Sequence, residues 1–150
     1  MNTATLSIIT AIQPTRLSKG FSVGAGGNLL KQAGGNLSQG KVETRELSTL
    51  ADLGAILQSL TPAQALVYGA PKNAATKVMT RKAFADAGSP QGATTRTNDA
   101  FAWPQGAGVM MLDYDPAAGG EPLDRDSLVQ AIRKAAPGLG GAGLLWWPSA

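Results

Sequence analysis

The chain has 150 residues, of which 43% are hydrophobic and 15% are charged, so it suits one domain with a core. It contains no Cys and no His, which excludes disulfides, thiolate sites, His-based catalytic triads and the common zinc sites. Any bound metal must therefore have oxygen ligands, which favours Mg²⁺ or Mn²⁺. The net charge is +3, with ten Lys/Arg and five Asp/Glu in residues 1–100, and three and five in residues 101–150. A basic N-terminal part and an acidic C-terminal part suit an anionic substrate beside a bound metal. A chance distribution of charged residues along the chain explains the same imbalance.

Neither a secretory signal nor a membrane span is evident. The first eleven residues have no basic start and no long apolar run. No stretch approaches the roughly 20 apolar residues that a bilayer-spanning helix needs. We therefore expect a cytoplasmic protein without a membrane partner.

The first half of the chain predicts strands around one helix. Residues 6–12 are β-branched and apolar, which indicates a strand that Pro14 ends. Residues 19–40 contain seven glycines and predict either a twisted hairpin or a mobile loop. A short strand at 42–47 precedes Ser48, which we expect to cap a helix.

That helix has leucines at positions 50, 53, 57 and 60, the apolar stripe of an amphipathic helix that Pro62 ends. Residues 65–68 then predict a buried strand closed by Gly69. Residues 70–104 are polar, basic and irregular.

The second half predicts a strand, a helix and a strand. Residues 109–112 are continuously apolar, as in a central strand covered on both faces. Asp124 should begin a helix that ends at Pro137, and residues 143–147 predict another strand. We expect an α+β fold, with a mixed or antiparallel sheet and flanking helices.

The triplet Asp113-Tyr114-Asp115 has the most chemical content. On a strand, residues i and i+2 face the same side, so both carboxylates would project together and repel unless a cation lay between them. Asp113 and Asp115 are therefore candidate catalytic ligands of Mg²⁺ or Mn²⁺. The alternative is that the triplet forms a turn before Pro116. For Asp124 and Asp126, capping of a helix is the favoured interpretation.

Basic and aromatic residues suggest a nucleic-acid contact. Arg96, Lys77, Arg81 and Lys82 could meet the phosphates of a nucleotide or a single strand, or could form a solvated surface. Several aromatic side chains could stack on bases: Phe84, Phe101, Trp103, Tyr114, Trp146 and Trp147.

The stretches Arg96-Thr97-Asn98-Asp99-Ala100-Phe101-Ala102-Trp103-Pro104 and 108–116 resemble the archaeo-eukaryotic primase superfamily. The likeness is closest to the primase-polymerase domains of phage and plasmid replication proteins. Their first catalytic motif is an apolar strand that ends in Asp-x-Asp or Asp-x-Glu, which Asp113 and Asp115 match. The resemblance implies a metal-dependent DNA primase or polymerase, with nucleotides and single-stranded DNA as partners.

This family uses a later Ser-x-His motif and a further acid, and the chain contains no His. The resemblance therefore implies a single domain over residues 1–150 that is truncated at the C-terminus and inactive by itself. It leaves open whether a helicase region follows in the intact parent. Two alternatives are a non-catalytic module that binds single-stranded nucleic acid and a structural domain that binds no ligand.

Overall fold

The computed structural model describes residues 3–14, 16–103, 105–106, 108–112, 114, 116 and 120–146. They confirm an α+β fold with a mixed five-stranded sheet. The chain divides into two compact units, Met1–Val109 and Met110–Ser149, and each is described by itself. The interpretation of residues 1–150 as one primase-polymerase-like domain stays a prediction.

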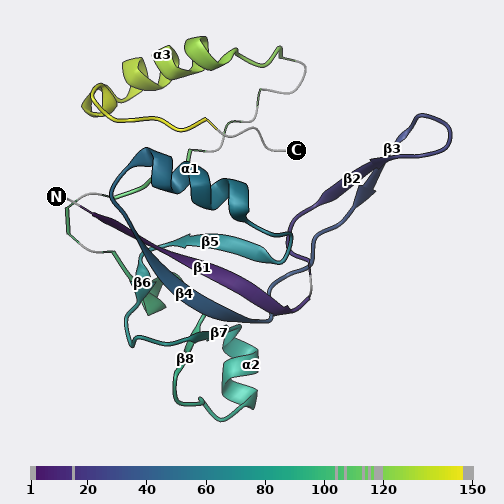
Figure 1. Cartoon of the computed structure of the whole chain (residues 1–150), viewed down its shortest axis with the longest axis vertical. Coiled ribbons are helices and arrows are strands. Elements are labelled where there is room, and N and C mark those ends of the chain that lie inside the picture. The colour runs from purple at the N-terminus through teal and green to yellow at the C-terminus, as the bar shows by residue number, and fades with distance from the viewer. Residues whose placement is uncertain are drawn as a thin grey trace. The chain divides into compact units, whose positions relative to one another are not determined.

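The sheet of the first unit has the strand order β5-β1-β4-β7-β8 (Figure 1). Its strands are β1 (Ala4–Gln13), β4 (Gln39–Leu47), β5 (Gln64–Tyr68), β7 (Lys77–Met79) and β8 (Ala93–Thr95). All neighbours are antiparallel except β7 and β8, which are parallel. The strands expected at 6–12, 42–47 and 65–68 are confirmed. The last of them, β5, is a half-buried strand at the sheet edge, so the expectation that it is buried is wrong.

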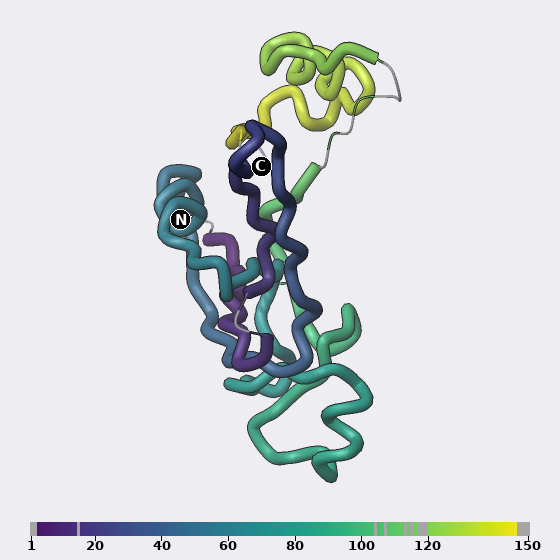
Figure 2. Tube along the Cα trace, turned by 90° about the vertical axis from the view of Figure 1, so that its right-hand side faces the viewer, coloured from purple at the N-terminus to yellow at the C-terminus, as the bar shows by residue number. Residues whose placement is uncertain are grey.

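Helix α1 (Leu50–Ser59) covers one face of this sheet (Figures 1 and 2). Leu6 and Ile8 alternate along β1 and pack with Leu53 of the helix in one buried cluster. The helix begins one residue later than expected. Thr49 rather than Ser48 is its cap, because the Thr49 hydroxyl accepts from the amide of Asp52, whose carboxylate accepts from the amide of Thr49.

The opposite face has its own buried cluster, built around Ile9, Val42, Val78 and Phe101. Residues 70–102, expected to be irregular, form several short elements. These are β6 (Ala70–Pro71), α2 (Arg81–Asp86), the 3₁₀ helix η1 (Asn98–Ala100) and β9 (Phe101–Ala102), together with β7 and β8. Elements of two to six residues are too short to leave a recognisable hydrophobic period.

The glycine-rich segment forms a two-stranded ribbon of β2 (Gly20–Val23) and β3 (Leu29–Gln32). Of the two structures expected there, the hairpin is therefore confirmed. The amide of Gly24 donates to the carbonyl of Asn28 across the turn, and Gly27 has a φ of 75° that favours glycine. Figure 1 shows the ribbon projecting beyond the five-stranded sheet.

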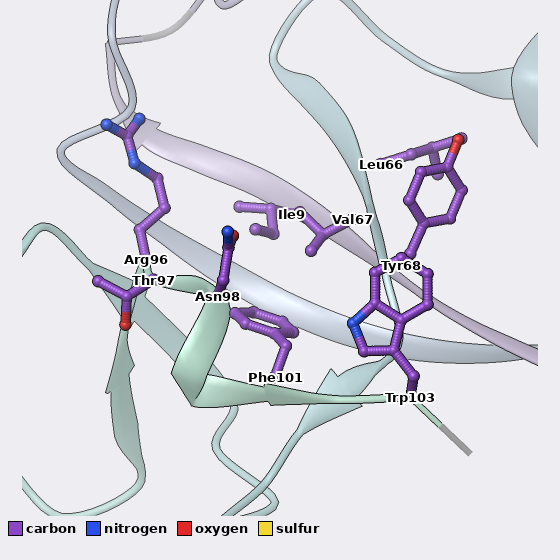
Figure 3. Close-up of a pocket in the computed structure, with 9 residues that line it drawn as sticks. All are labelled: Ile9, Leu66, Val67, Tyr68, Arg96, Thr97, Asn98, Phe101 and Trp103. Atoms are coloured by element: carbon purple, nitrogen blue, oxygen red, sulfur yellow. The ribbon is translucent and has the colours of Figure 1, made fainter. Parts of the chain in front are cut away.

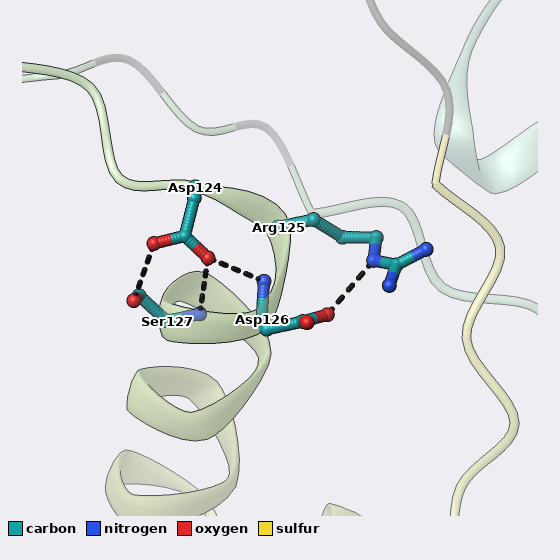
Figure 4. A network of polar contacts seen from close by, with 4 residues as sticks. All are labelled: Asp124, Arg125, Asp126 and Ser127. Atoms are coloured by element: carbon teal, nitrogen blue, oxygen red, sulfur yellow. Dashed lines mark hydrogen bonds and ion pairs between the residues drawn. The ribbon is translucent and has the colours of Figure 1, made fainter.

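The second unit contains α3 (Arg125–Ala135) and the 3₁₀ helix η2 (Pro137–Leu139). Asp124 caps α3, since one of its carboxylate oxygens accepts from the amides of Asp126 and Ser127 (Figure 4). The Asp126 carboxylate pairs with Arg125 at 2.9 Å. The expected helix and its cap are confirmed. Among the helices of the described residues, none is long and apolar enough to cross a bilayer.

The strand expected at 109–112 is wrong, because the structure describes these four residues without any strand pairing. Met110, Met111 and Leu112 are 50–70% exposed, whereas a central strand would bury them. The strand expected at 143–147 is also wrong over its described part, 143–146. An apolar run becomes a strand only where a neighbouring strand offers its hydrogen bonds, and sequence pattern alone does not supply that partner.

Candidate functional site

A hollow of about 430 Å³ opens beside the edge strand β5 in the first unit (Figure 3). Its lining residues are Ile9, Leu66, Val67, Tyr68, Arg96, Thr97, Asn98, Phe101 and Trp103. Three of them are consecutive in β5, and consecutive strand residues face opposite sides, so the hollow reaches around the edge of the sheet. Its size falls within the range of small-molecule sites.

One end of the hollow is aromatic. The rings of Tyr68 and Trp103 have centroids 5.6 Å apart and planes inclined by 36°. Trp103 is 61% exposed, so most of its indole is free to contact a ligand. Burial raises the pKa of the Tyr68 phenol, which therefore stays protonated at neutral pH and can donate a hydrogen bond.

A bend at Gly69 brings these two rings together. Gly69 has a φ of 82°, and a Cβ at this position would overlap the carbonyl oxygen of Ala102. Ala70 pairs with Ala102 just beyond the bend, which sets Trp103 beside Tyr68.

Two buried hydrogen bonds hold this bend against β1. The Ser7 hydroxyl, which is fully buried, donates to the Gly69 carbonyl at 2.7 Å. The amide of Gly69 donates to the carbonyl of Thr5 at 3.0 Å. Both polar groups of the glycine backbone are thus satisfied away from solvent, so the approach of β9 to β5 is fixed.

The other end of the hollow is polar. Figure 3 shows Arg96 and Asn98 on one side, Tyr68 and Trp103 on the other, and the apolar Ile9 and Val67 between them. The amide of Arg96 donates to the carbonyl of Met79 at 2.7 Å, which anchors its backbone to β7. Within the described residues the exposed Arg96 side chain forms no ion pair.

This combination can recognise a particular kind of ligand. An exposed indole beside a phenol suits a planar aromatic group, because stacking on such rings does not depend on base identity. A guanidinium across an apolar floor suits a phosphate, which it can bind with two parallel hydrogen bonds. A nucleotide carries both groups.

The structure places the predicted phosphate-binding residues in different surroundings. Arg96 lines the hollow, whereas Lys77, at the start of β7, and Arg81 and Lys82, in the first turn of α2, are exposed and do not line it. A contact of those three residues with nucleic acid stays a prediction.

Asp113 and Asp115 lie outside the described residues, so their geometry as a metal pair stays a prediction as well. Their carboxylate oxygens match the ligands that Mg²⁺ and Mn²⁺ prefer. Over the described ranges, no three acidic side chains gather into a group that could hold a metal.

Two described carboxylates are already engaged by neighbouring hydroxyls. The Thr97 hydroxyl lowers the pKa of Asp99, with a further contribution from the charge of Arg81. The Ser127 hydroxyl lowers the pKa of Asp124, which caps α3. Both carboxylates are therefore ionised at neutral pH.

Sequence reasoning identified Arg96 and, among the aromatics, Trp103 and Phe101, but it missed Tyr68 and Asn98. The sequence predicts a buried strand at Tyr68, and only the position of β5 at the sheet edge exposes this residue to the hollow.

Comparison of the chain with protein-family models, with curated proteins and with solved structures finds no match.

Proposed function

We propose that the chain is the nucleotide-binding part of a metal-dependent nucleotidyltransferase, of the primase-polymerase kind found in mobile-element replication proteins. The observation that supports this most directly is the hollow with an exposed Trp103 at one end and Arg96 at the other. A nucleotide is the ligand whose base and phosphates match both ends.

In this proposal Trp103 and Tyr68 hold the base, and Arg96 holds a phosphate. The Asn98 amide, which has both a donor and an acceptor, adds a hydrogen bond to the sugar or base. Asp113 and Asp115 would hold Mg²⁺ or Mn²⁺, which supplies charge neutralisation for the phosphates when bound. We expect no primer synthesis from these 150 residues alone, since no His is present for the Ser-x-His motif of the family.

A second candidate is a non-catalytic module that binds single-stranded nucleic acid. One observation favours it: every residue of the hollow lies between positions 9 and 103, so its binding surface does not require Asp113 or Asp115. The two candidates differ in metal dependence. The first predicts that Mn²⁺ strengthens binding of a nucleoside triphosphate through Asp113 and Asp115. The second predicts that binding does not depend on these two aspartates.

The test is calorimetric titration of the protein with a deoxynucleoside triphosphate, with and without Mn²⁺. Trp103→Ala and Arg96→Gln should each weaken binding by roughly ten-fold or more, because a base stack or a charged hydrogen bond is worth about 1–3 kcal/mol. Lys134→Gln, which removes an exposed cation of α3 that does not line the hollow, should leave affinity unchanged.

Double substitution of Asp113→Asn with Asp115→Asn should abolish the gain from Mn²⁺. If the gain survives, the nucleotidyltransferase proposal fails and the non-catalytic module is favoured. If Trp103→Ala and Arg96→Gln both bind as tightly as wild type, the hollow is not the site and both candidates fail.

A further inference from the structure

The β2–β3 ribbon presents an unusual exposed face. The strand register pairs Phe21 with Lys31 and Val23 with Leu29, so these four side chains share one face. All four are exposed, with Val23 at 74% and Leu29 at 67%. The ribbon thus combines an aromatic ring, a cation and two apolar groups on a surface that solvent reaches.

The charge around the ribbon has a single sign. From Pro14 to Lys41 the chain carries four basic residues and no Asp or Glu. These residues are Arg16, Lys19, Lys31 and Lys41. The first acidic residue along the chain is Glu43, so no carboxylate within this segment neutralises the cations. Such a surface attracts a polyanion and repels a second copy of itself.

The base of the ribbon is fixed to the rest of the first unit. The amides of Leu17 and Ser18 donate to the carbonyl of Pro62 at 2.7 and 3.2 Å. The amide of Gly35 donates to the carbonyl of Arg16 at 3.0 Å, and a Cβ on Gly34 would overlap the carbonyl of Leu17. The two chain segments therefore cross in close contact, and this crossing holds the root of the ribbon in place.

A second hollow, of about 230 Å³, connects this base with the first one. Leu17 and Gly35 line it at the root of the ribbon. Ile9, Val67 and Arg96 line both hollows. Arg96 therefore lies between the hollow that contains Trp103 and the root of the ribbon.

We propose that the β2–β3 ribbon is a second binding surface for single-stranded DNA, which continues from the first hollow past Arg96. Phe21 stacks on an unpaired base, and Lys31 and Lys19 contact phosphates. A neutral bilayer or a second copy of the ribbon would cover the apolar side chains but would leave the cations of this segment without a matching charge. The inference goes beyond binding of one nucleotide, because the ribbon contacts bases other than the one in the hollow.

The test is fluorescence anisotropy with labelled oligothymidylate long enough to span both surfaces, over a range of salt concentrations. Phe21→Ala with Lys31→Gln should weaken binding of the oligonucleotide by roughly ten-fold or more. Lys31→Gln alone, an exposed substitution that spares the fold, should reduce the slope of log affinity against log salt by about 0.7, the loss of one single-strand phosphate contact.

Binding of a free deoxynucleoside triphosphate should not change in either ribbon variant, which separates this inference from the proposed function. The exposed Lys134→Gln, at a residue with no proposed contact to nucleic acid, serves again as the charge-matched control. Equal affinity of wild type and ribbon variants for the oligonucleotide would overturn the inference. So would tighter binding of a duplex of the same length, or a ribbon-dependent dimer in light scattering.

Discussion

The bend at Gly69 gives the most direct test of how the aromatic end of the hollow is built. Gly69→Ala imposes two costs. A left-handed conformation costs an alanine about 1–2 kcal/mol, of which about 0.4–1 kcal/mol is offset by the lower entropy of the unfolded chain. The new Cβ also overlaps the Ala102 carbonyl, and relief of such an overlap costs typically about 1–3 kcal/mol. The free energy of unfolding should therefore fall by about 1–4.5 kcal/mol.

Gly88→Ala is the matched control for this substitution. Gly88 has a φ of 70°, close to that of Gly69, but a Cβ there meets no atom within 4 Å. Gly88→Ala has the conformational cost without the overlap, so the free energy of unfolding should fall by no more than about 1.6 kcal/mol.

The assay is urea unfolding followed by far-UV circular dichroism, with near-UV circular dichroism to report the Tyr68–Trp103 contact. Gly69→Ala should lose much more stability than Gly88→Ala and should also alter the aromatic signal. Equal losses in the two variants would refute the reasoning, because the approach of β9 to Gly69 would then have no energetic consequence.

Three further substitutions test the surrounding structure, each by urea unfolding. Ser7→Ala removes the donor to the buried Gly69 carbonyl and should cost about 1–3 kcal/mol; no loss would show that this hydrogen bond contributes nothing. Leu53→Ala, in the cluster under α1, should cost about 2–5 kcal/mol, and a loss below about 1 would contradict its burial. The amide of Thr49 lowers the pKa of Asp52 below 3.8. The hydrogen-bonded Asp52 carboxylate therefore contributes fully to the free energy of unfolding above pH 3.8, and this contribution disappears as pH falls through the lowered pKa. Asp52→Asn should flatten this acid-side loss, and an unchanged pH profile would count against the cap.

Local signals predicted much of the fold. The β-branched run of β1, the leucine stripe of α1 and the capping position of Asp124 each act within one element, and the structure confirms all three. The strand predicted at Val109-Met110-Met111-Leu112 is wrong, because a strand depends on a pairing partner that lies elsewhere in the sequence. The short elements between 70 and 102 are held by pairing with distant segments, as when β6 pairs with β9.

The candidate site was predictable only in part for the same reason. Arg96 and Trp103 can be recognised in the sequence, because they are a cation and an aromatic residue close together in the chain. Tyr68 joins them only because β5 lies at the edge of the sheet and Gly69 turns the chain toward β9. Such a contact depends on long-range packing that residue type and spacing do not encode.

The central claim is that the hollow holds the base of a nucleotide against Trp103. It can be measured with Trp146→Phe and Trp147→Phe, which leave Trp103 as the sole tryptophan. Titration of this protein with thymidine triphosphate, corrected for absorption by the ligand, should quench the emission to saturation, and Arg96→Gln should shift the midpoint to higher concentration. Emission that stays constant at every nucleotide concentration would contradict the claim.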